Sequence, residues 1–514
     1  MAALLRGPAR AMRVAASAAG GGGRGEWLTG FGLVRRMTSS IQDVFTHIEN
    51  NQQLFVKRLA EWVSVRSVSS QPELRGEVLR MVQMTAQHIE RLGGAVEMVD
   101  IGTETLADGS KLALPPVILA EIGRDPAKKT VCVYGHLDVQ PAQLEDGWDS
   151  DPFTLTHRNG KMYGRGATDD KGPVLSWLNC IESFQAVSKA LPVNVKLCLE
   201  GMEESGSIGL GELIAERGKS FFGNVDCVCI SDSYWLGTQT PCLTFGLRGL
   251  CYFEIEVQCA QKDLHSGVYG GSVHEAMTDL TRILASLVDS SGRILVPGIY
   301  ESVKPLSEME AQLCANVDFS PEEYRLEIGA TTLQQHTKED ILNHRWHLPS
   351  LSIHGIEGAF SELGQKTVIP SRVVGKFSIR TVPDMEPDEV ERQVKDYVAQ
   401  TFSELRSPNR FRITMPVGSQ AWVADSTHPN YTAGRNAMRR VFGVEPNLIR
   451  DGCSIPVTLD FARHTALNVL LLSLGACDDG AHSQNEKFNL SNYMNGMKVM
   501  ASYLEELSLV LPKE

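Results

Sequence analysis

Histidine and acidic residues recur just after short apolar segments of this 514-residue chain. Four segments show the pattern: His136 and Asp138 follow 130–134, Glu203 and Glu204 follow 193–199, Asp232 follows 227–230, and His482 follows 469–474. Asp169 adds a carboxylate within a glycine-rich segment, Gly164-Arg-Gly-Ala-Thr-Asp-Asp-Lys-Gly-Pro173. Each residue alone has an ordinary explanation, such as a helix-capping aspartate. Together they form a set of nitrogen and oxygen ligands.

Such a set predicts metal chemistry. Two imidazoles and several carboxylates gathered at one rim would repel one another unless a positive group lay among them. A pair of divalent cations meets that need, because mixed N/O ligands suit Zn²⁺ or Mn²⁺ and a shared carboxylate holds two ions ~3.5–4 Å apart. Two ions acidify water and polarise a carbonyl, so one further carboxylate can manage the proton transfers. The pattern predicts a metal-dependent hydrolase, although it contains no local zinc motif such as His-Glu-x-x-His.

The helices and strands expected around these residues indicate an α/β fold. Continuous apolar strands at 130–134, 193–199, 227–230 and 469–474 alternate with helical periodicity, which runs first over 41–65 and then over 74–92. This alternation indicates a mostly parallel sheet covered by helices on both faces. Ligand sites in such sheets lie beyond the carboxyl ends of the strands. Each polar cluster falls at that end.

Residues 248–425 have a different pattern. Long alternating strands at 250–259 and 373–382 and an amphipathic helix at 273–288 indicate an α+β unit with an antiparallel sheet. Because the α/β pattern resumes afterwards, we expect this unit to be an insertion that splits the first domain.

The composition argues against two classes of partner. The formal net charge is −13 without a compensating Lys/Arg block, so no nucleic-acid partner is expected. No apolar run approaches the ~20 residues of a membrane span, so no membrane partner is expected either. The eleven cysteines include no Cys-x-x-Cys pair. Six lie in apolar segments and are expected to be buried thiols in a reducing compartment: Cys132, Cys198, Cys227, Cys229, Cys251 and Cys259.

Residues 1–36 differ from the rest of the chain. They hold six arginines, no lysine and one acidic residue, Glu26. An Arg-rich, acid-poor N-terminus is typical of a mitochondrial transit peptide. The alternative is a disordered tail, or an upstream start with the working protein beginning at Met37. That alternative predicts a cytoplasmic protein, whereas a transit peptide would make it mitochondrial.

Five motifs resemble those of the M20 metallopeptidases, in particular their carnosinase branch. They are Gly135-His-Leu-Asp-Val-Gln140, the segment 164–173, Glu200-Gly-Met-Glu-Glu-Ser-Gly206, Asp263-Leu-His-Ser-Gly-Val-Tyr-Gly-Gly271 and the segment 478–484. The resemblance extends from about Ser40 to the C-terminus. It implies an N-terminal extension at 1–37, a catalytic domain at 38–247 and 426–514, and an inserted lid and dimerisation domain at 248–425.

The resemblance also implies two divalent metal ions per subunit, Mn²⁺ or Zn²⁺. Asp169 would bridge both ions. Glu204 and His482 would complete the ligands of one ion, and His136 and Asp232 those of the other.

Two further residues receive catalytic roles from the same resemblance. Glu203 would act as the general base that takes a proton from the metal-bridging water and delivers it to the leaving amine. Asp138 would orient His136 from behind and raise its basicity. The family also typically has a cis peptide bond at the position of Asp169-Asp170.

Substrate contacts are implied as well. His265 would reach into the active site of the partner subunit in a homodimer and stabilise the oxyanion. Four other residues would hold the substrate's termini: Thr367, Arg380, Asp451 and Ser454. The remaining substrate contacts are shared with the metal site and its base: Glu203, Glu204, Asp232 and His482.

We therefore expect a homodimeric enzyme that hydrolyses dipeptides with free termini, including Cys-Gly and carnosine-like substrates. One alternative is an M20 N-acyl-amino-acid deacylase or carboxypeptidase, which needs an apolar acyl pocket in place of a site for a free amine. A more distant alternative is a non-catalytic metal-binding scaffold. Such a scaffold is expected to lose the base or a ligand, and this sequence retains both.

Overall fold

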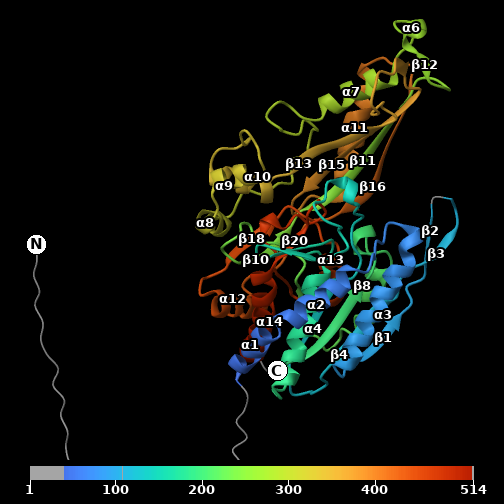
Figure 1. Ribbon diagram of the computed structural model, residues 1–514. Helices are drawn as coiled ribbons and strands as arrows, with labels where there is room; N and C mark the ends of the chain where they lie inside the picture. Colours follow the sequence, from blue (N-terminus) through green and yellow to red (C-terminus); the bar gives the residue numbers. More distant parts are fainter. Residues whose placement is uncertain (1–39, 107, 512–514) are drawn as a thin grey trace, which may run out of the picture. The chain divides into compact units, whose positions relative to one another are not determined.

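The computed structural model describes residues 40–106 and 108–511. The predicted extension at 1–37 therefore lies outside the described residues. A nine-stranded sheet forms the centre of the fold (Figure 1). Its strands have the order β1-β4-β8-β5-β9-β19-β10-β17, with β18 beside β10. Its four central strands are β8 (Asn194–Glu200), β5 (Thr130–His136), β9 (Cys227–Ile230) and β19 (Val469–Leu472).

These central strands are parallel and completely buried. Their parallel pairing and complete burial confirm the prediction of a parallel sheet that is covered on both faces. The flanking pairs are not all parallel, because β4 (Val117–Ile122) runs antiparallel to β8 and β10 (Cys242–Leu247) runs antiparallel to β19. All four strand ends that precede the predicted site lie in the parallel centre.

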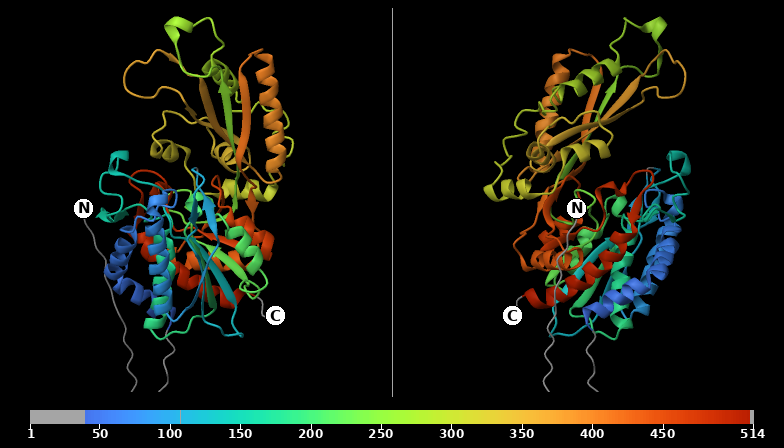
Figure 2. Two further views of the ribbon diagram at one scale, coloured as in Figure 1. Left: turned by 90° about the vertical axis from the view of Figure 1, so that its right-hand side faces the viewer. Right: turned by 60° about the vertical axis from the view of Figure 1, so that its left-hand side comes forward.

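Helices pack on both faces of this sheet (Figure 2). One apolar core joins the sheet to α1 (Ile41–Asn50), α2 (Gln52–Val63), α3 (Arg75–Arg91), α4 (Lys171–Ala186), α12 (Pro429–Phe442) and α14 (Leu490–Val510). A second core joins the other face to α5 (Leu210–Arg217) and α13 (Val457–Thr465). The prediction of a single helix over 41–65 is wrong. The chain forms two helices, because Asn51 (φ −107°, ψ 16°) leaves the helical conformation between them.

An antiparallel sheet occupies the inserted segment, in the order β13-β15-β11-β16. Its strands are β11 (Gly249–Gln258), β13 (Ser350–Glu357), β15 (Arg372–Thr381) and β16 (Arg410–Ser419). The helices α7 (Ala276–Ser286) and α11 (Pro387–Glu404) share an apolar core with it. The chain rejoins the nine-stranded sheet at β17 (Trp422–Val423). This arrangement confirms the predicted α+β insertion, whereas its boundaries at 248 and 425 stay predictions.

The remaining elements are short or peripheral. The strands are β1 (Ala95–Val99), β2 (Thr103–Thr105), β3 (Lys111–Ala113), β6 (Thr156–Arg158), β7 (Lys161–Tyr163), β12 (Leu264–His265), β14 (Val368–Ile369), β18 (Asn447–Asp451) and β20 (Lys487–Asn489). The helices are α6 (Ser266–Tyr269), α8 (Glu308–Asn316), α9 (Pro321–Glu327) and α10 (Lys338–Trp346). None of the described helices is long and apolar enough to cross a membrane.

The cysteines are all free thiols. Five of the six predicted to be buried are so, and Cys259 is half-buried at the end of a strand of the inserted sheet. Burial raises the pKa of Cys132 and Cys198, so these thiols remain protonated at neutral pH. They behave as small apolar side chains of the core.

Candidate active site

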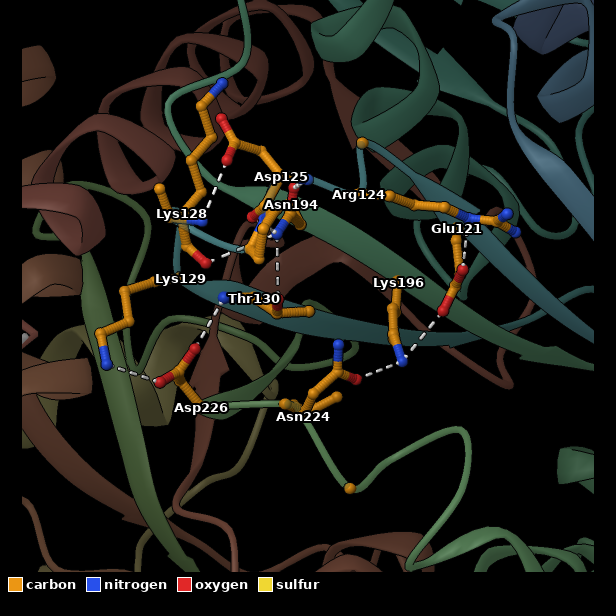
Figure 3. A pocket seen from close by; sticks show the side chains of 15 residues that line it. Glu121, Arg124, Asp125, Lys128, Lys129, Thr130, Asn194, Lys196, Asn224 and Asp226 are labelled. Carbon is orange, nitrogen blue, oxygen red and sulfur yellow. Dashed lines mark hydrogen bonds and ion pairs between the residues drawn. The ribbon is translucent and has the colours of Figure 1, made fainter. Parts of the chain in front are cut away.

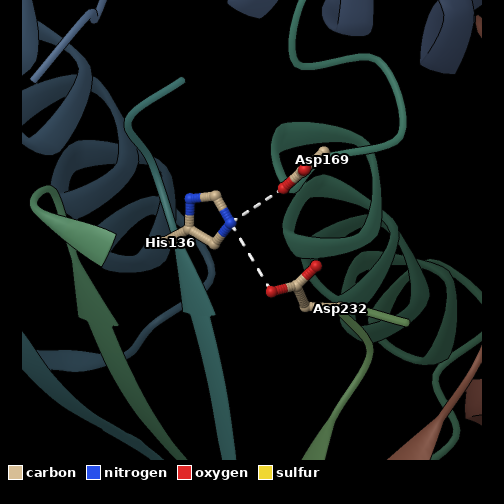
Figure 4. Close-up of side chains that lie close together, drawn as sticks. All are labelled: His136, Asp169 and Asp232. Atoms are coloured by element: carbon tan, nitrogen blue, oxygen red, sulfur yellow. Dashed lines mark hydrogen bonds and ion pairs between the residues drawn. The ribbon is translucent and has the colours of Figure 1, made fainter. Parts of the chain in front are cut away.

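His136 ends the central strand β5, and its side chain is completely buried. Its Nε2 lies 3.0 Å from Oδ1 of Asp169 and 3.6 Å from Oδ2 of Asp232. These residues come from three separate segments and converge on one point (Figure 4). Their ligand atoms all lie within 4.8 Å of one another, so the trio has the geometry of a metal site.

A second trio uses the other oxygen of Asp169. Oδ2 of Asp169 lies 3.1 Å from Nε2 of His482, and that nitrogen lies 3.0 Å from Oε2 of Glu204. The ligand atoms of this trio also lie within 4.8 Å of one another. Asp169 therefore belongs to both groups and presents one carboxylate oxygen to each.

The charges at this rim fit divalent cations. Burial, together with the nearby Asp169, raises the pKa of Asp232 to about 7. Hydrogen bonds to Asp169 and Glu204 raise the pKa of His482 to about 11. In the cation-free chain the histidines thus act as the counter-charges of the carboxylates. Divalent cations would take over that role and leave neutral imidazoles free to bind them.

Asp138 organises the turn that carries the two adjacent glutamates. Its Oδ1 accepts the backbone N–H of Glu203 at 3.2 Å, and its Oδ2 accepts that of Glu204 at 3.1 Å. Oδ1 also lies 3.4 Å from Nδ1 of His136. One buried carboxylate therefore contacts the predicted ligand His136 and fixes the backbone of the predicted base.

The turn around Asp169 packs tightly against the end of β5. The Asp169-Asp170 peptide bond is cis, in agreement with the resemblance. Oδ2 of Asp170 accepts the backbone N–H of His136 at 3.2 Å. A Cβ at Gly135 would lie 2.7 Å from that Oδ2, so the strand must carry a glycine here. The predicted helix follows directly as α4, which begins at Lys171.

Two of the predicted substrate residues meet where the inserted sheet joins the central one. Nη1 of Arg380, at the end of β15, donates to Oγ of Ser454 at 2.9 Å. The same hydroxyl donates to the carbonyl oxygen of Arg248 at 2.6 Å. Asp451 lies nearby in sequence, but its Oδ1 accepts the N–H of Cys453 at 3.3 Å. Arg380 and Ser454 thus form one polar pair, whereas the carboxylate of Asp451 caps its own loop.

The other two, His265 and Thr367, lie side by side at the tip of the inserted unit. His265 belongs to β12, which pairs with β14 directly after Thr367. The carbonyl of Thr367 accepts the N–H of Ser266 at 3.1 Å, and Nδ1 of the exposed His265 accepts the N–H of Gly267 at 2.9 Å. In the described part of the chain, neither residue forms a hydrogen bond or ion pair with a predicted metal ligand.

Comparison with known proteins identifies the family. A family model described as "Peptidase family M20/M25/M40" matches residues 132–506. The chain belongs to this M20 peptidase family. The predicted M20 metallopeptidase is therefore confirmed, and membership implies that divalent metal ions take part.

Similar M20 proteins cover nearly the whole chain. A Beta-Ala-His dipeptidase of Rattus norvegicus is 50% identical over 473 residues, which are 92% of this chain and 96% of the relative. A Cys-Gly metallodipeptidase dug1 of Schizosaccharomyces pombe is 47% identical over 93% of this chain and 100% of the relative. A solved structure of the dipeptidase Dug1p from Saccharomyces cerevisiae has a TM-score of 0.89 and 48% identity, covering 93% of this chain and 100% of that one.

Two features of this M20 site went beyond the sequence analysis. Gln140 holds the carboxylate of Glu204, because its Nε2 donates to Oε2 at 2.7 Å and its backbone N–H donates to Oε1 at 3.1 Å. The buried pair Arg165 and Glu486 lies behind Asp169, with Nη1 and Oε2 at 2.7 Å. Gln140 and Arg165 stand inside the motifs quoted above, and Glu486 stands two residues beyond the last of them. For Gln140 and Arg165, the position inside a motif was the available signal; Glu486 had none.

A hollow lies at the opposite end of the same M20 sheet. Figure 3 shows this space of about 780 Å³, into which the first residues of β5 and β8 project. Two of its lysines are paired with acids, since Nζ of Lys129 lies 3.0 Å from Asp226 and Nζ of Lys196 lies 3.0 Å from Glu121. Among the described residues, both groups of potential metal ligands lie at the carboxyl ends instead.

Proposed function

We propose that this chain hydrolyses dipeptides with free termini, using two divalent cations per subunit. The observation that carries the proposal is the shared Asp169, whose two oxygens face two separate ligand groups. A shared carboxylate is the usual means of holding two ions close together. The names of similar proteins, Beta-Ala-His dipeptidase and Cys-Gly metallodipeptidase, support dipeptides as the substrate class.

The proposed ligands divide into two sets. His136 and Asp232 would hold one cation, Glu204 and His482 the other, and Asp169 both. When bound, zinc or manganese would supply Lewis acidity toward the scissile carbonyl and toward water. Imidazole and carboxylate ligands accept either metal, and availability would decide between them.

Glu203 is the proposed general base. Burial raises its pKa well above that of an ordinary glutamate, and the neighbouring Asp232 and Glu204 raise it further. Nearby cations would oppose this effect and favour the carboxylate form. The group can therefore accept a proton from water and return it to the leaving amine. Its backbone N–H bond to Asp138 keeps it at the rim.

Arg380 and Ser454 are proposed to hold the substrate's free carboxylate. Guanidinium and hydroxyl donors suit a carboxylate, and the two side chains already contact each other. Asp451 is proposed to assist them through its loop. The acidic rim of Glu203, Glu204 and Asp232 would favour a protonated amine at the other end of the dipeptide.

A homodimer is proposed to complete the site. His265 is exposed at the tip of the inserted unit, beside Thr367, which suits a pair that acts in the partner subunit's active site. Mixing His265→Ala chains with Glu203→Gln chains should restore activity in heterodimers, because one of the two sites then has both groups intact. Absence of any rescue at a mixing ratio that forms heterodimers would argue against the shared site.

We also propose a cytoplasmic location.

The test of the proposed function is a substrate panel. Metal-loaded protein should hydrolyse Cys-Gly and β-Ala-His, and chelator-treated protein should not. N-acetylated dipeptides should be poor substrates, because they lack the free amine. Preference for the N-acetylated forms would instead favour a deacylase, and equal turnover after chelation would contradict a metal-dependent reaction.

A further inference from the structure

A buried ion pair lies directly behind the proposed bridging residue. The side chains of Arg165 and Glu486 are 3% and 0% exposed, and Nη1 lies 2.7 Å from Oε2. Neither of them belongs to a ligand group. Burying a charged pair is costly unless further hydrogen bonds satisfy it, so its partners indicate what it does.

Glu486 fixes the backbone of Asp169. Its Oε1 accepts the N–H of Thr168 at 3.1 Å and the N–H of Asp169 at 3.2 Å. Hydrogen bonds to an ionised acceptor are stronger than neutral ones. The peptide groups that precede the Cα of Asp169 are therefore held, and with them the direction in which its carboxylate points.

The same pair also holds the loop that carries His482. The backbone carbonyl of Glu486 accepts the N–H of Gly164 at 2.9 Å, and Nη2 of Arg165 donates to the carbonyl of Ser483 at 3.2 Å. His482 has a φ of 61°, which is unfavourable for a residue with a Cβ. Such a conformation persists only where the surroundings enforce it.

We propose that Glu486, together with Arg165, is a positioning residue that sets the spacing between Asp169 and His482. This inference rests on the proposed function, since it assigns the pair to the cation group of Asp169, Glu204 and His482. Glu486 contacts no reacting atom in this arrangement. It acts by joining two loops whose side chains meet at 3.1 Å.

The test is Glu486→Gln, which keeps the volume but places an amide where the carboxylate accepted from Arg165 and from two backbone N–H groups. Zn²⁺ binding would be measured by competition with a chromogenic chelator. Loss of groups that support metal ligands weakens affinity by about 10–100-fold. We expect Glu486→Gln to bind one of its two zinc equivalents more weakly by this factor. Its kcat should fall by a larger factor than its KM changes.

Glu200→Gln is the matched control. Glu200 is equally buried, and its Oε1 accepts from the hydroxyls of Tyr134 and Ser207 at 2.7 Å each, but it joins neither loop. This variant should retain both zinc equivalents at wild-type affinity. Arg165→Lys provides a milder test, because it keeps the charge and loses the forked donors; it should weaken the same equivalent by a smaller factor.

Thermal unfolding of the chelator-treated variants separates positioning from general destabilisation. Retention of both zinc equivalents at wild-type affinity by Glu486→Gln would overturn the proposal. Equal zinc losses in Glu486→Gln and Glu200→Gln would overturn it too, since destabilisation would then suffice. If Glu486→Gln does not fold, the result for Arg165→Lys decides. Failure of the wild-type protein to bind zinc would instead refute the proposed function.

Discussion

The two ends of the central parallel strands differ in charge balance. At the amino ends, Asp226 contacts Lys129 and also accepts the N–H of Thr130 at 2.7 Å. At the carboxyl ends, the acids of the two ligand groups form ion pairs with histidines and with no lysine or arginine among the described residues. The hollow of about 780 Å³ lies at the amino ends.

Unbalanced buried charge therefore marks the reactive site here, whereas a hollow lined by paired charges does not. At the amino ends, Lys129 and Lys196 are paired with acids, and these pairs stabilise the fold. At the carboxyl ends the carboxylates repel one another, and their perturbed pKa values indicate a functional site.

Glu203→Gln should lower kcat for Cys-Gly by about 10²–10⁴-fold, the usual contribution of a general base. The amide cannot take the proton but has nearly the same shape. Metal content, measured by elemental analysis, should be unchanged. The matched control at the other end is Glu121→Gln, which should leave kcat at the wild-type level. Wild-type turnover by Glu203→Gln would assign the base to another group.

Chelation should destabilise the protein and abolish its activity. Cations that bind only the folded state stabilise it, by about 2.7 kcal/mol when the free concentration is a hundred times Kd. Differential scanning calorimetry should therefore show a higher Tm with Zn²⁺ than with a chelator. The double variant Asp169→Asn, His482→Gln should lose most of that increase, whereas Asp226→Ala should retain it. An identical Tm with and without Zn²⁺ in the wild type would contradict cation binding at this rim.

Asp226→Ala should cost about 1 kcal/mol of stability, because it removes a hydrogen bond to the backbone N–H of Thr130 and leaves Lys129 without its partner. Urea unfolding would measure the loss. The kcat for Cys-Gly should stay unchanged. A large loss of activity in a folded Asp226→Ala protein would show that the amino ends also serve the reaction.

The charged residues at the amino ends should contribute only slightly to the loss of folding stability in acid. Burial alone would raise the pKa of Glu121, but its contacts with Lys196 and Arg124 outweigh this effect and lower it. A depressed folded pKa adds stability above the unfolded value, and that stability is lost as pH falls through the folded value. Glu121→Gln should thus flatten the decline in stability below about pH 4, near the pKa of a free glutamate. Unchanged acid unfolding curves would assign that decline elsewhere.

Local patterns were enough to predict most of the fold. The buried strands β5 and β9 consist mainly of apolar residues, and Pro173 in the first turn of α4 marks the helix start. The antiparallel flanks were not predictable in this way, since strand direction depends on long-range pairing. Nor was the break at Asn51, which lies within a continuous amphipathic pattern.

The metal ligands of the candidate site could be predicted from the sequence, because their residue types indicate metal binding. His136, Asp169, Asp232, Glu204 and His482 are typical ligands, and the structure brings them together. The supporting residues were harder to find. Gln140 and Glu486 act through hydrogen bonds to groups 64 and 317 or more positions away, which no local pattern encodes. The roles of His265 and Thr367 stay predictions, because they concern a second subunit.

The central claim is that one carboxylate, Asp169, serves two cations. Titration of chelator-treated protein with Zn²⁺, followed by elemental analysis after desalting, tests it most directly. We expect two tightly bound equivalents per chain in the wild type. Asp169→Asn should lose both, or all but one weak equivalent. A single equivalent in the wild type, or two tight equivalents retained by Asp169→Asn, would contradict it.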